Sequence, residues 1–256
     1  MANTLLDLFE KNPQLLEWRD KVTLLSRQLV MGFSGSSKAV VMASALSEQV
    51  PKILIVTSTQ NEAEQLTGDL SAILGEDKVY SFFADDVVAA EFIFASPEKT
   101  HSRLESLNFL MDKEASGVLV TSLVGTKLHL PNPKVYKDSR IDLTLGEEHD
   151  LEALSKHLTH IGYQRVEQVL SPGEYSRRGD ILDIYEMTSE LPYRLEFFGD
   201  EIDGIRQFDS DSQKSLDNLE HVIVSPADDI ILTREDYQRA EKALESAVSK
   251  AEGPHK

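Results

Sequence analysis

The sequence contains no cysteine, and no apolar run in it is long enough to cross a membrane. The lack of cysteine excludes disulfides and thiolate metal sites, and it fits the reducing cytoplasm. A membrane span needs about 18–20 consecutive apolar residues. The N-terminus also lacks the basic and apolar regions of a secretory signal. We therefore expect a cytoplasmic protein without a membrane partner.

Basic residues are scarce: 26 lysines and arginines stand against 44 acidic residues, which gives a net charge of −18. Binding to nucleic acid requires cations that replace the counterions of the phosphates. The charge balance therefore predicts weak or no nucleic-acid binding by this chain. Its 256 residues are enough for one or two ordinary cores.

The first part of the chain alternates between strand and helix patterns. The apolar run Lys52–Thr57 is typical of a strand covered on both faces, and Thr59 with Glu62 forms a capping box for the next helix. The pattern predicts further strands at 79–83 and 117–121 and helices at 18–29, 60–74 and 97–110. It therefore predicts a parallel α/β sheet in a first domain, residues 1–133, which ends at a proline-rich interruption.

The second part has closely spaced strand patterns and little room for helices. After a helix capped by Asp150, the pattern predicts strands at 164–169, 179–185, 193–198 and 202–208. This spacing predicts an α+β module with an antiparallel sheet, residues 134–218. In the remaining segment, 219–256, we expect Val222–Val224 to rejoin the first sheet and a last helix to begin near Thr233. We expect this chain to be a fragment of a longer protein.

A loop near the N-terminus resembles a nucleotide-binding P-loop. It runs through Gly32, Gly35, Ser37, Lys38 and Ala39, between an apolar run at 29–31 that we expect to be a strand and a helix. In a functional P-loop a glycine lets backbone N–H groups enclose the phosphates, and a final hydroxyl binds Mg²⁺. Here Ser37 replaces that glycine, and Ala39 has no oxygen for the metal. We interpret the loop as a degenerate P-loop without catalytic function.

Three segments of the second part carry a specific resemblance. They are Gly162–Arg165, Gly173–Tyr185 and Tyr193–Asp203. In these segments the chain resembles the excinuclease protein UvrB and, more closely, the N-terminal region of the bacterial transcription-repair coupling factors (the Mfd family). The segment Met187–Arg194 favours the coupling factors. The degenerate loop does so as well, because UvrB keeps a functional P-loop.

The resemblance implies a docking function. In this family the α/β domain corresponds to UvrB domain 1a, and the module after it corresponds to domain 2 and binds UvrA, the damage-recognition protein of the excinuclease. The family's contact residues match Arg178, Arg194 and Phe198. The resemblance also implies that this part of the protein is not an enzyme and needs no cofactor or metal. The ATP-dependent DNA translocase of such proteins lies downstream. A separate regulatory hypothesis is that intramolecular contacts with this translocase cover the docking surface until it is needed.

The chemistry of these three residues suits a protein interface. A guanidinium presents a planar fork of donors for a partner carboxylate. Strand alternation places Phe197 and Phe198 on opposite faces, so that one ring is exposed, and arginine and aromatic residues are enriched in interface hot spots. The alternative interpretation is structural: each arginine pairs with a neighbouring acid, and Phe198 fills a second small core.

Two other functions remain open. The loop with Lys38 would bind ATP weakly, or the chain would bind DNA by analogy with the aromatic hairpin of UvrB. The matching region, 82–96, contains acidic residues but no lysine or arginine, which argues against DNA. The histidines, among them His157 and His160, lack the spacing and third ligand of a metal site.

Overall fold

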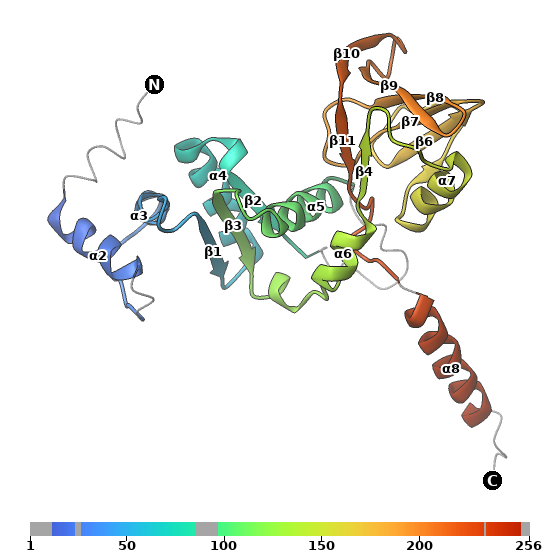
Figure 1. Cartoon of the computed structure of the whole chain (residues 1–256). Coiled ribbons are helices and arrows are strands. Elements are labelled where there is room, and N and C mark those ends of the chain that lie inside the picture. The colour runs from blue at the N-terminus through green and yellow to red at the C-terminus, as the bar shows by residue number, and fades with distance from the viewer. Residues whose placement is uncertain (1–11, 24–26, 85–96, 233, 252–256) are drawn as a thin grey trace. The chain divides into compact units, whose positions relative to one another are not determined.

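The computed structural model describes residues 12–23, 27–84, 97–232 and 234–251. The chain forms two compact units, Met1–His129 and Leu130–Lys256 (Figure 1). They contain a parallel sheet, antiparallel strands and helices, so the predicted mixed α/β class is confirmed. Within the described ranges, no helix has the length and apolar character needed to span a membrane.

The first unit is built on a three-stranded parallel sheet in the order β1-β3-β2. The strands are β1 (Lys52–Thr57), β2 (Val79–Phe82) and β3 (Gly117–Ser122). The helices are α2 (Pro13–Thr23), α3 (Ser37–Ser44), α4 (Gln60–Leu74) and α5 (Pro97–Met111), with short 3₁₀ turns at Glu76–Lys78 and Gly125–Lys127. Figure 1 shows β3 between its two neighbours.

The helix α4 begins where the capping signal predicts. Thr59 is extended, and its side chain accepts a hydrogen bond from the backbone N–H of Glu62 at 3.2 Å. The Glu62 carboxylate does not return this bond to Thr59 but accepts one from the Ser58 hydroxyl at 2.9 Å. The first backbone N–H groups of a helix have no acceptor within the helix, and the cap supplies one for the N–H of Glu62.

The two faces of this sheet are covered unequally. One face packs Ile55, Val118 and Val120 against α3 and α4. On the other face, α5 packs on β2, where the rings of Tyr80 and Phe109 stack with centroids 4.1 Å apart.

Strand β1 lies at an edge of the sheet, and part of it is open. Its side chains Leu54 and Val56 are 61% and 44% exposed. The prediction that both faces of this strand are covered is therefore wrong. A continuous apolar run shows that a segment is suited to burial, but tertiary packing decides which residues are covered.

The segment before the loop at Gly32 also differs from its prediction. Helix α2 ends at Thr23, whereas the apolar spacing predicts a helix to residue 29. Leu29 and Met31 are 86% and 77% exposed and lie in no strand. A strand forms only with a hydrogen-bonding neighbour, and within the described residues this segment has none. The predicted strand at 29–31 is therefore wrong.

The second unit contains a six-stranded sheet in the order β10-β9-β8-β7-β6-β5. Its strands are β5 (Gln164–Arg165), β6 (Glu174–Arg178), β7 (Ile181–Ile184), β8 (Tyr193–Phe198), β9 (Glu201–Phe208) and β10 (Ser215–Leu219). The β5–β6 pair is parallel and the other pairs are antiparallel. The helices are α6 (Pro133–Ser139), α7 (Leu151–His160) and α8 (Arg234–Ala251).

A separate two-stranded sheet joins β4 (Ile141–Thr144) to β11 (His221–Val224) in antiparallel register. We expected Val222–Val224 to rejoin the first sheet, and this prediction is wrong. The apolar run is a strand, but its partner precedes the six-stranded sheet in the sequence. The pattern of one strand carries no information on which distant strand it pairs with.

Helix α7 and the segment that follows β11 complete the core of the second unit. Asp150 accepts hydrogen bonds from the N–H groups of Glu152 and Ala153 at 2.8 and 2.9 Å, as the predicted cap requires. The Tyr163 hydroxyl donates to the carbonyl of Ser225 at 2.9 Å. This bond joins the start of the domain's sheet to the chain that follows β11.

Candidate partner-docking site

The strands β7 and β8 place charged residues on one face and core residues on the other. Their register pairs Asp183 with Arg194 and Leu182 with Leu195. Leu182 and Leu195 are fully buried in the core. Because neighbours along a strand point to opposite faces, Asp183 and Arg194 share the other face of the sheet.

Asp183 lies at the centre of an ionic cluster. Its side chain is fully buried, and it accepts three hydrogen bonds. Arg194 donates from Nε to Oδ1 at 2.7 Å and from Nη2 to Oδ2 at 2.9 Å, and Arg178 donates from Nη2 to Oδ2 at 2.8 Å. A buried carboxylate needs such partners because its desolvation is costly. Asp183 thereby holds together the two arginines that the sequence identifies.

The two arginines differ in exposure. The Arg178 side chain is 51% exposed, and that of Arg194 is 14% exposed. The Arg194 guanidinium also lies over the ring of Phe208, 4.4 Å from its centroid. The hydrogen bonds to Asp183 raise the pKa of Arg194 above its ordinary value. Arg194 is therefore a fixed cation, whereas Arg178 keeps much of its surface available to a partner.

Phe198 is the most exposed aromatic residue on the sheet face that carries Asp183 and Arg194. Its side chain is 82% exposed, whereas Phe197 is 6% exposed and belongs to the core. A two-residue turn follows, and Gly199 has the positive φ of 67° that the first position of a type I′ or II′ hairpin turn requires. The ring therefore stands at the end of β8, next to a tight hairpin. The alternative in which Phe198 fills a second core is wrong.

Further arginines line the same part of the second unit. Arg206 pairs with Glu196 between β9 and β8. Beside β5 and β6 lies an open hollow of about 450 Å³. Its lining consists of Arg165, Val166, Glu167, Ser176, Arg177 and Arg178. In a chain of net charge −18, this part of the surface is locally rich in cations. We call Arg178, Arg194 and Phe198 the docking triad.

Some backbone amides of the loop at Gly32 already have partners within the loop. The Ser37 hydroxyl donates to the carbonyl of Ser34 at 2.6 Å and accepts from the Ser34 N–H at 3.1 Å. The N–H of Lys38 bonds to the carbonyl of Gly35 at 3.3 Å. A phosphate cradle needs amides that point at the ligand. The amides of Ser34 and Lys38 already have partners inside the loop.

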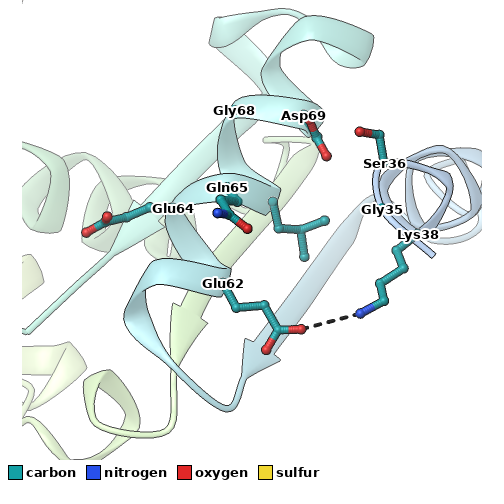
Figure 2. Close-up of a pocket in the computed structure, with 9 residues that line it drawn as sticks. Gly35, Ser36, Lys38, Glu62, Glu64, Gln65, Gly68 and Asp69 are labelled. Carbon is teal, nitrogen blue, oxygen red and sulfur yellow. Dashed lines mark hydrogen bonds and ion pairs between the residues drawn. The ribbon is translucent and has the colours of Figure 1, made fainter. Parts of the chain in front are cut away.

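Lys38 is engaged as well. Its Nζ lies 3.5 Å from Glu62 Oε1, in a hollow of about 640 Å³ between α3 and α4 (Figure 2). Figure 2 shows the Lys38 side chain directed at Glu62. Glu64 and Asp69 line the same hollow. The hydrogen bond from Ser58 and the neighbouring Lys38 ammonium lower the pKa of Glu62. This hollow carries more negative than positive charge, and Ala39 is fully buried.

The remaining candidates of the sequence add no site. His157 contacts the carbonyl of Ser139 at 3.2 Å, and its ring centroid lies 6.4 Å from that of His160. No group of three metal-ligating side chains occurs in the described part of the chain. Most of the region compared with the DNA-binding hairpin, residues 85–96, lies outside the described residues.

Comparison with known proteins identifies the region that contains the docking triad. Residues 141–229 match the UvrB interaction domain family. Most of the second unit is therefore similar to UvrB interaction domains. All three residues of the triad lie inside this matched segment, on β6 and β8.

Beyond the segment that matches the UvrB interaction domain family, most of the chain is similar to transcription-repair-coupling factors. It is 33% identical to that of Bacillus subtilis over 225 residues, which cover 88% of this chain and 19% of that protein. It is 32% identical to that of Staphylococcus haemolyticus over 219 residues, 86% of this chain and 19% of that protein. The resemblance recognised in the sequence is confirmed, and the chain spans about a fifth of the length of these relatives.

Sequence reasoning missed one neighbour of the triad. Gln213 contacts Arg194 with both its backbone carbonyl and its side-chain amide. The sequence offers a turn signal in this segment but nothing that joins residue 213 to residue 194. The sequence predicts a neighbouring acid as a partner of each arginine, but nothing in it singles out Asp183 as the partner of both.

Proposed function

We propose that this chain is the docking part of a transcription-repair coupling factor and that its UvrB interaction domain binds UvrA. One observation carries the proposal: an 82% exposed phenylalanine stands in the same domain as two arginines that share a buried aspartate. Aromatic residues together with arginines are typical anchors of interfaces.

The chemistry of the triad indicates the kind of surface it meets. Arg178 is half exposed and uses one nitrogen on Asp183, so other donors of its fork are left for a partner carboxylate. Phe198 needs an apolar recess. The matching surface on UvrA therefore combines acidic side chains with an apolar pocket. Charge complementarity of this kind contributes to specificity and to the rate of association.

We further propose that the first unit does not hydrolyse nucleotides. The loop amides bonded within the loop, the Lys38–Glu62 ion pair and the missing hydroxyl at Ala39 support this proposal. On this proposal the loop at Gly32 is a degenerate P-loop that keeps the lysine but neither the phosphate cradle nor the metal ligand. The chain then contributes recruitment of a repair protein, and any DNA translocase activity belongs to other parts of the coupling factor.

Calorimetric titration of this chain with purified UvrA tests the docking function. We expect micromolar or tighter binding by the unaltered chain. Arg178→Ala and Phe198→Ala should each weaken binding by about 2 kcal/mol, roughly thirtyfold, as truncation of a hot-spot residue does. Both side chains are exposed enough for the variants to fold, and thermal denaturation of each variant checks this.

Two exposed residues outside the UvrB interaction domain provide matched controls. Arg239 and Tyr237 lie on α8 with side chains 77% and 58% exposed. Arg239→Ala and Tyr237→Ala should bind UvrA as tightly as the unaltered chain does. Absence of binding by the unaltered chain would refute the docking function. Equal losses in the control variants would show that the triad is not the contact.

A further inference from the structure

The turn between β9 and β10 contains an unusual backbone conformation. Gln213 has a φ of 60°, and it is the one residue other than glycine with positive φ in the described ranges. This left-handed conformation is unfavourable for a residue with a side chain such as glutamine. Its N–H donates to the carbonyl of Asp209 at 2.8 Å. Such a conformation persists only where surrounding contacts hold it.

The side chain of Gln213 connects three segments. Its Oε1 accepts from Arg194 Nη2 at 3.3 Å, and its backbone carbonyl accepts from Arg194 Nη1 at 3.4 Å. Its Nε2 donates to the carbonyls of Ser210 at 2.7 Å and Val169 at 3.3 Å. The left-handed backbone thus allows two oxygens of one residue to face the same guanidinium.

Arg194 is consequently held from two sides. Asp183 occupies Nε and Nη2, Gln213 meets Nη1 and Nη2, and the ring of Phe208 lies beneath the guanidinium. A free arginine side chain would lose rotamer freedom when a partner orders it. Here that freedom is already lost before any partner arrives.

We propose that Gln213 is a positioning residue of the docking surface: together with Asp183 it fixes the Arg194 guanidinium so that its remaining Nη1–H meets a carboxylate of the partner. This inference rests on the proposed function for its partner, UvrA. Gln213 itself need not touch UvrA. Its effect on binding passes through Arg194.

A purely structural role in the turn makes different predictions, and two substitutions separate the roles. Asparagine tolerates the left-handed conformation better than glutamine does, but its side chain is one methylene shorter and does not reach Arg194. Glutamate keeps the length and the acceptor oxygen, but it cannot donate to the carbonyls of Val169 and Ser210. Gln213→Asn therefore removes the side-chain contact with Arg194 as well as the ties within the loop, while the bond from Arg194 to the backbone carbonyl stays. Gln213→Glu removes the ties within the loop alone.

The first measurement is affinity for UvrA by calorimetry. We expect Gln213→Asn to weaken binding about three- to tenfold, the range for one side chain that must be ordered on binding, without lowering the melting temperature. Gln213→Glu should bind as the unaltered chain does. Unchanged affinity in Gln213→Asn, or an equal loss in Gln213→Glu, would overturn the inference.

The second measurement needs no partner. In a ¹H–¹⁵N spectrum, the Nε–H of Arg194, assigned by its disappearance in Arg194→Lys, should exchange slowly with solvent because it is bonded to buried Asp183. Gln213→Asn should increase this exchange rate. If the rate does not change, Gln213 does not position Arg194, whatever UvrA does. If the rate increases but the unaltered chain does not bind UvrA, the proposed function fails while the positioning of Arg194 stands.

Discussion

Asp183 and Arg194 face each other across β7 and β8 and are joined by two hydrogen bonds, of 2.7 and 2.9 Å, through both carboxylate oxygens. Because Arg178 donates to the same carboxylate, a buried acid determines the positions of both arginines of the docking triad. The ion pairs that would make these arginines purely structural are present. Arg178 is nevertheless 51% exposed, so structural and docking roles are compatible.

Replacing the central acid should destabilise the second unit. Asp183→Asn removes the charge that offsets two guanidiniums, and the buried amide cannot accept all three hydrogen bonds. We expect a loss of about 2 kcal/mol or more in the free energy of unfolding, measured by urea denaturation. Asp203→Asn, an exposed acid on β9, is the control and should change little. Equal stability of both variants would contradict the central role of Asp183.

The adjacent phenylalanines should behave in opposite ways. Phe197→Ala empties a core position and should lower the free energy of unfolding by about 3 kcal/mol. Phe198→Ala removes an exposed ring and should change it by less than about 0.5 kcal/mol, while it weakens binding to UvrA. Thermal denaturation of the two variants checks the first part. A large loss of stability in Phe198→Ala would show that the ring packs against the protein.

Nucleotide should not stabilise the chain. The negatively charged hollow around Lys38 and the bonded loop amides predict no change in melting temperature at millimolar ATP with Mg²⁺. A ligand at one hundred times its dissociation constant would stabilise the folded state by about 2.7 kcal/mol, which such a scan detects easily. A clear rise in melting temperature would contradict the interpretation of the loop as degenerate.

The second unit should lose stability in alkaline solution. Burial raises the pKa of Tyr163 well above its ordinary value and also raises that of Tyr136. The pKa of tyrosine in an unfolded chain is about 10. A group whose folded pKa is raised contributes stability that is present below the unfolded pKa and lost as pH rises above it.

Denaturation between pH 8 and 11 measures this effect. The unaltered chain should lose stability above about pH 10, and the loss per pH unit should be smaller in Tyr163→Phe, by up to about 1.4 kcal/mol. Tyr237→Phe changes an exposed tyrosine of α8 and should follow the unaltered chain. An identical pH profile in Tyr163→Phe would contradict this assignment.

Local signals in the sequence were reliable where the physics is local. Thr59 and Asp150 cap the helices that they predict, since a cap depends on atoms within three residues. The bounds of the strands at 52–57 and 193–198 match their predictions. The alternation that exposes Phe198 and buries Phe197 is confirmed for the same reason, because the side chains of a strand alternate between faces.

Pairing between distant segments was not predictable in the same way. The run at 29–31 is apolar but has no strand partner among the described residues, and Val222–Val224 pairs with β4 instead of the first sheet. β6 was missed altogether, because Glu174–Arg178 lacks an apolar pattern and is a strand by virtue of its neighbours. These outcomes depend on which segments meet in space.

By itself the sequence predicted the mixed α/β class, the resemblance to the transcription-repair coupling factors and Arg178, Arg194 and Phe198 as candidate contact residues, since these follow from local patterns and from motifs. Only the tertiary structure decided that Asp183 is buried between Arg178 and Arg194 and that Gln213 takes a left-handed conformation against Arg194. These contacts join residues on different strands and turns. Their energies come from desolvation and hydrogen-bond geometry, which exist only after the sheet has formed.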